Sequence, residues 1–67
     1  MATADKMRLH RDTLDAEIAR LNALMRTLEL RIETLEGAGM DASAERKQLS
    51  ETDEQRIAAT ARRSSLA

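Results

Sequence analysis

Large apolar residues recur in the first half of the chain with the spacing of a coiled coil. From Leu14 to Leu35 the intervals between them are 4, 3, 4, 3, 4 and 3 residues, the 3.5-residue repeat of helices that pack along one seam. In heptad notation these residues alternate between positions d and a, and Met7 extends the d series toward the N-terminus. The pattern predicts one long amphipathic helix over about residues 4–36.

Two glycines mark the end of this helix. Gly37 suits the left-handed backbone position just past a helix, and Gly39 follows within two residues. We therefore expect a turn over residues 37–41. Asp41 or Ser43 is suited to cap a second helix, because both side chains can accept a hydrogen bond from a free backbone N–H.

The second helix is expected over about residues 42–62, followed by a frayed tail at 63–67. Its large aliphatic residues are Leu49 and Ile57, which we place on one face, with small alanines around them. The stretch from Thr52 to Gln55 resembles a capping box and predicts a break near residue 51. This segment thus has high helix propensity but only a narrow apolar face.

Two arrangements of the two helices are compatible with the pattern. In the first, the chain reverses at the glycines and forms an antiparallel hairpin. In the second, both glycines lie within a single bent rod, and Ala42 and Leu49 continue the d series. The continued seam would then contain Arg46, Asp53 and other charged residues, which cannot form a dry interface. The hairpin is the favoured prediction, with residues 1–67 as a single small helical module.

Some residues of the first helix depart from a plain two-stranded zipper. Leu24 lies at position g and widens the apolar stripe, while Leu9 and Leu30 lie at position f, opposite the seam. A helix that is apolar on so many positions is expected to contact more than one neighbour. Arg11 occupies an a position, where it either sets the register or marks the end of the seam.

Composition supports an all-α protein that depends on association. The chain has 67 residues and contains no cysteine, aromatic residue or proline, so it has little from which to build a sheet and no disulfide. Chains this short bury little surface and are commonly stabilised by disulfides, metals or oligomerisation. With one histidine and no cysteine, a His/Cys metal site is excluded, and oligomerisation or docking onto another protein remains.

Charge, targeting signals and composition indicate the expected location and source of the protein. The formal net charge is −1, but residues 1–28 carry +1, residues 29–55 carry −5 and residues 56–67 carry +3. Neither a membrane span nor an apolar secretory segment is present in the sequence, so a cytoplasmic protein is expected. Nine arginines against two lysines, with abundant alanine, favour a high-GC bacterium or its phage as the source.

The sequence contains no recognisable catalytic, phosphate-binding or DNA-binding motif. The leucine repeat lacks the dense basic segment that a DNA-binding zipper needs before it, so nucleic acid is not an expected partner. Gly37-Ala38-Gly39 lacks the Lys and Ser/Thr of a phosphate loop, and His10 has no evident catalytic partner. We predict no catalytic residue, no metal or cofactor site and no enzyme.

The layout of a long helix, a glycine turn and a shorter second helix resembles small bacterial coiled-coil families. It also resembles the short cochaperones that hold type III secretion needle subunits. The resemblance covers topology and composition, and the second helix lacks the aliphatic and aromatic residues that those families place there. It assigns the chain to no family.

The sequence therefore predicts a non-enzymatic interaction module that self-associates through the first helix, most simply as a dimer, into a coiled coil or helical bundle. The alternative is a small adaptor, cochaperone or phage-type inhibitor that binds a different protein through the same stripe. The predicted interface residues are Met7, Leu14, Ile18, Leu21, Leu24, Met25, Leu28, Ile32 and Leu35.

Overall fold

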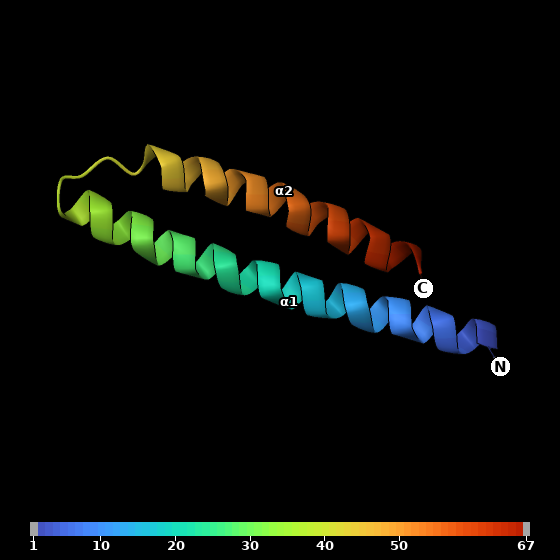
Figure 1. The fold of residues 1–67 in the computed structure, drawn as a ribbon. Coiled ribbons are helices and arrows are strands. Elements are labelled where there is room, and N and C mark those ends of the chain that lie inside the picture. Colours follow the sequence, from blue (N-terminus) through green and yellow to red (C-terminus); the bar gives the residue numbers. More distant parts are fainter. Residues whose placement is uncertain (1, 67) are drawn as a thin grey trace.

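Two helices form an antiparallel hairpin (Figure 1). The computed structural model describes residues 2–66, and for residues 2–5 only the course of the backbone. Helix α1 comprises Ala2–Gly37 and helix α2 comprises Ser43–Ser65, packed side by side in a rod of 57 × 14 × 13 Å. No strand occurs within the described residues. The predicted all-α hairpin is confirmed, and the single continuous rod is excluded.

The reversal after α1 is a Schellman turn centred on Gly39. The Met40 N–H donates to the Leu35 carbonyl at 2.8 Å, and the Gly39 N–H donates to the Glu36 carbonyl at 3.0 Å. This pair of bonds requires a left-handed residue at Gly39, whose φ is +73°. Gly37 is the last residue of α1 and has no positive φ. The prediction that Gly37 takes the left-handed position was therefore wrong by two residues.

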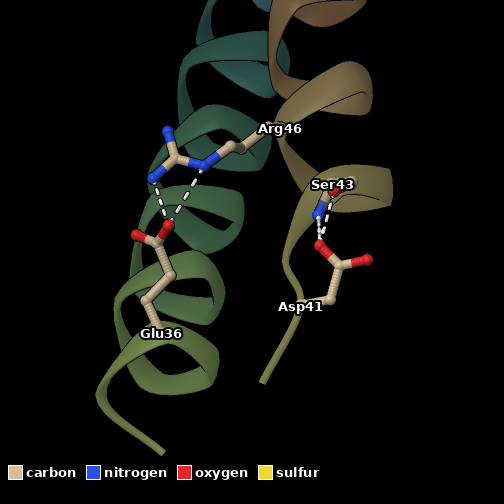
Figure 2. Close-up of polar contacts among 4 residues, drawn as sticks. All are labelled: Glu36, Asp41, Ser43 and Arg46. Atoms are coloured by element: carbon tan, nitrogen blue, oxygen red, sulfur yellow. Dashed lines mark hydrogen bonds and ion pairs between the residues drawn. The ribbon is translucent and has the colours of Figure 1, made fainter. Parts of the chain in front are cut away.

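An Asp41 turn starts α2 (Figure 2). The Asp41 carboxylate oxygen Oδ1 accepts hydrogen bonds from the Ser43 backbone N–H, at 3.0 Å, and from the Ser43 hydroxyl. The residue at the cap position itself is Ala42, which has no side chain that can bond the helix end. Both bonds favour the ionised carboxylate and lower the pKa of Asp41.

One ion pair bridges the two helices beside the turn (Figure 2). Oxygen Oε2 of Glu36, at the end of α1, accepts hydrogen bonds from Nε of Arg46, at 3.2 Å, and from its Nη2. These hydrogen bonds and the attraction of the two charges raise the pKa of Arg46. Both side chains are half exposed, so the pair aligns the helix ends more than it stabilises them.

Helix α2 is continuous from Ser43 to Ser65, so the predicted break near residue 51 is wrong. The Thr52 hydroxyl donates to the Gln48 carbonyl at 2.8 Å, a bond back into its own helix. A capping threonine would instead accept from the following turn, and here that turn is already helical. Residues 63–65 are also helical, although we expected a frayed tail. Ala67 lies outside the described residues.

The core is a single row of side chains between the two helices. Its α1 side is made of leucine and isoleucine at seam positions, and its α2 side contributes alanine. Leu21, at the middle of α1, is the most enclosed, with 1% of its surface exposed. The buried hydrophobic residues are Leu14, Leu21, Leu28, Ile32, Ala42 and Ala59.

The two glycines should respond oppositely to alanine. Gly37→Ala should raise the free energy of unfolding by about 0.5–1 kcal/mol, because Gly37 is helical and a Cβ there meets no atom within 4 Å. Gly39→Ala should lower it by about 1–2 kcal/mol, because alanine resists the left-handed conformation. Urea unfolding followed by circular dichroism measures both changes. Equal effects of the two substitutions would contradict the placement of the Schellman turn.

Asp41 should give the hairpin an acid-sensitive contribution to stability. Because its pKa is lowered in the fold, that contribution is present above about 3.8, the ordinary aspartate value, and is lost as pH falls through the lowered pKa. Asp41→Ala should therefore lower the melting temperature at pH 7 and have little effect at pH 2. Asp41→Asn, which keeps an acceptor without titrating, is the matched control. A loss in Asp41→Ala that persists at pH 2 would show that ionisation is irrelevant.

Candidate functional site

The face of α2 that packs on α1 follows its own heptad repeat. Its residues are spaced alternately by three and four, as in α1, but most are small or polar. Three of them are buried and the other five are half-buried. The repeat consists of Ala42, Glu45, Leu49, Thr52, Arg56, Ala59, Arg63 and Leu66.

Small side chains at the centre of this face fit the long side chains of α1. Ala59 is 2% exposed and Thr52 is 4% exposed, so both lie directly against the other helix. Alanine and threonine leave room for leucine and isoleucine, and the Thr52 hydroxyl is already bonded within α2. The predicted apolar face of α2 was only partly right: Leu49 is half-buried, but Ile57 is 55% exposed on the outer side.

Charged side chains flank the small residues. Arg63 Nε donates to Asp15 Oδ1 at 2.8 Å across the two helices, and Arg56 Nη2 donates to Asp53 Oδ1 at 2.7 Å within α2. The aliphatic parts of both arginines can cover apolar surface while the guanidinium groups reach water. One oxygen of Glu45, Oε2, is buried without a hydrogen-bond partner among the described residues. This uncompensated polar atom weakens the seam.

The residues predicted as an interface share one face of α1, the face that meets α2. Within the chain, Leu14, Leu21, Leu28 and Ile32 are already buried. Half-buried residues flank them along the groove between the helices, and Met7 is exposed beyond the core. Whether a second chain contacts any of them stays a prediction. The half-buried members are Ile18, Leu24, Met25 and Leu35.

Other apolar residues lie away from the seam. Leu9 and Leu30, on the outer side of α1, are 64% and 60% exposed, as their f positions predicted. Met40 in the turn and Ile57 on α2 are also exposed. Leu9 and Leu30 thus leave apolar surface exposed on the side of α1 that α2 does not cover.

Two open grooves run along the junction of the helices. One, of about 470 Å³, lies between the N-terminal half of α1 and the last turn of α2, with His10, Glu17, Arg62 and Ser65 among its lining residues. Within the described part of the chain no hydrogen bond links these four side chains, and the Ser65 hydroxyl donates to the Ala61 carbonyl of its own helix at 3.0 Å. Arg56 and Met25 line the other groove.

Among the residues described, no group of three or more His, Asp or Glu side chains is arranged to hold a metal ion. No helix in the described range has the length and apolar character needed to cross a membrane. No family model matches the chain, and neither the curated proteins nor the solved structures yielded a match.

The α2 face was not predicted because most of its residues are small or polar, whereas large aliphatic residues are the usual mark of a buried helix face. Its signal was present in the heptad spacing of residues of mixed type: Ala42, Leu49 and Arg56 are seven apart, as are Glu45, Thr52 and Ala59. Whether an alanine is buried depends on how closely the backbones of the two helices approach each other. That distance cannot be inferred from any single residue. A search for heptads that admit Ala and Thr would have found this face.

Close packing at Ala59 gives a direct test of the interface. Ala59→Leu should lower the free energy of unfolding by about 1–3 kcal/mol, because the larger side chain must push the helices apart. Ala58→Leu is the matched control: it adds the same atoms at the exposed neighbouring position and should change stability by less than about 0.5 kcal/mol. Urea unfolding provides the comparison. Similar losses in both variants would contradict the described α2 face.

Proposed function

We propose that this chain is a non-enzymatic helical-hairpin module that self-associates, most simply as a dimer, with α1 as the principal contact element. The observation that carries the proposal is the distribution of apolar surface on α1. The hairpin buries one face of this helix and leaves leucines exposed on the opposite face. Association would remove that remaining surface from water.

The thin core supports the same conclusion. Among the residues whose burial is described, six hydrophobic ones are buried and two of these are alanines, and the seam also holds arginines and a partly unsatisfied Glu45. An isolated pair of helices with so little buried apolar area is marginal, and the chain has no cysteine with which to cross-link it. A partner that covers α1 would supply stability that the hairpin lacks.

The half-buried groove residues add a second source of binding energy. Ile18 and Met25 flank the seam on the a side, and Leu24 flanks it on the g side, each with part of its surface exposed. In helical bundles such flanking positions contact the third and fourth helices. A helix that lies along this groove would contact these residues, whereas the outer leucines of α1 form a separate surface.

Self-association should appear as a concentration-dependent fold. Sedimentation equilibrium of the full chain from about 1 to 500 μM should show a reversible oligomer, since the exposed apolar surface is covered only in the assembly. Thermal melting followed by circular dichroism should shift upward over the same dilution series.

Two results would contradict the proposal. One is a folded monomer, with a melting temperature that does not depend on concentration. The other is an unfolded chain at every concentration, which would favour the alternative of an adaptor, cochaperone or phage-type inhibitor that folds on a different protein.

A further inference from the structure

Along the outer face of α1, the order of residue types is almost the same in both chain directions. Its f positions, one heptad apart, are Leu9, Ala16, Ala23 and Leu30, a palindrome about a point between residues 19 and 20. All four are exposed, and they lie opposite the face that α2 covers. A two-fold axis through that point would place Leu9 against Leu30 of a second copy, and Ala16 against Ala23.

Threonines lie beside these four f positions, and burying their hydroxyl groups in an interface would add no desolvation cost. The hydroxyls of Thr13, Thr27 and Thr34 donate to carbonyls of their own helix at 2.8, 3.1 and 2.9 Å. Their hydrogen-bonding demand is therefore met before any contact forms. Alanine and threonine beside leucine are also the residues with which α2 packs on α1, so this chain already uses such a surface for helix pairing.

Charges beside the stripe follow the same two-fold relation. Lys6 and Glu33 lie at mirrored positions about the point between residues 19 and 20, and Asp12 and Arg26 are mirrored to within one residue. Among the described residues none of these four forms an ion pair. A symmetric interface requires that residue i meet residue j and that j meet i. Here both mirrored pairs are of opposite charge.

The whole hairpin has a matching charge asymmetry. Residues 29–55, which form the turn end, carry eight carboxylates and three cations, a net charge of −5. Residues 1–28 and 56–67, which include the open end, carry +1 and +3, a net charge of +4. Parallel neighbours would place like charges together along the rod, whereas antiparallel neighbours bring opposite ends together.

We propose that the partner on this outer face is a second copy of the chain, bound antiparallel about a two-fold axis near residues 19–20 of α1. This inference rests on the proposed self-association and specifies its surface and direction. It leaves the a and d residues inside each hairpin and makes α1 the central pair of a four-helix assembly.

Charge reversal tests the Asp12–Arg26 contact. Asp12→Arg and Arg26→Glu should each weaken the dimer by about tenfold at low salt, because each converts two attractive contacts into two repulsive ones. The double variant, Asp12→Arg with Arg26→Glu, should restore the dissociation constant measured by sedimentation equilibrium. The two residues are 14 apart on one helix, about 21 Å, so a contact within one chain cannot produce this rescue.

The control for net charge is Lys47→Glu, which makes the same change as Arg26→Glu at an exposed position of α2. It should not weaken the dimer. Equal weakening by Lys47→Glu, or a double variant as weak as the single ones, would overturn the inference while leaving self-association intact. A chain that is monomeric at all concentrations would overturn both.

Spin labels test the direction independently, because the chain has no natural cysteine. Nitroxides attached to Arg20→Cys should lie within about 20 Å of each other across the two-fold axis. Those on Thr34→Cys should be about 43 Å apart, given 1.5 Å of helix rise per residue. Short distances at both sites would indicate a parallel pair, and long distances at both would place the interface elsewhere. The first result would refute the antiparallel direction and the second would refute this surface, even for a protein that dimerises.

Discussion

The packing of leucines from α1 against alanine and threonine from α2 holds this molecule together. Long side chains on both helices would keep the backbones apart and leave gaps, whereas small residues on α2 let Leu21 become almost fully enclosed. The two helices thus divide their roles, since α1 supplies most of the apolar volume and α2 supplies the space into which it fits. The turn, the flanking ion pairs and the exposed outer face all take their positions from this contact.

Much of this arrangement could be predicted from the residues, and the reasons are particular. The interval pattern from Leu14 to Leu35 predicted α1 and its buried face, because leucine and isoleucine repeated at this spacing lie on one side of a helix, where a partner helix can bury them together. The two glycines predicted the reversal. The precise place of the left-handed residue depended on which carbonyls remained free at the helix end, and Gly37 and Gly39 were equally suited to that position.

Helix α2 was harder to predict because its face is defined by backbone approach and not by hydrophobicity. Ile57 is strongly apolar but exposed, since it is eight residues after Leu49 and the heptad positions fall at Leu49 and Arg56. Thr52 had the spacing of a cap, yet its hydroxyl bonds inside an existing turn. In both cases packing against α1 determined the position of the side chain, and the local sequence preference of the residue had little effect.

The short turn has a consequence for the order in which the hairpin assembles. Glu36 and Arg46 are only ten residues apart in sequence, whereas Asp15 and Arg63 are separated by 48. Closing a small loop costs less chain entropy than closing a large one, so we expect contacts beside Gly39 to form first and pairing to proceed from there toward the termini. The last turns to close, at the open end, are also the first to separate, and backbone amides there would exchange with solvent before those beside the turn.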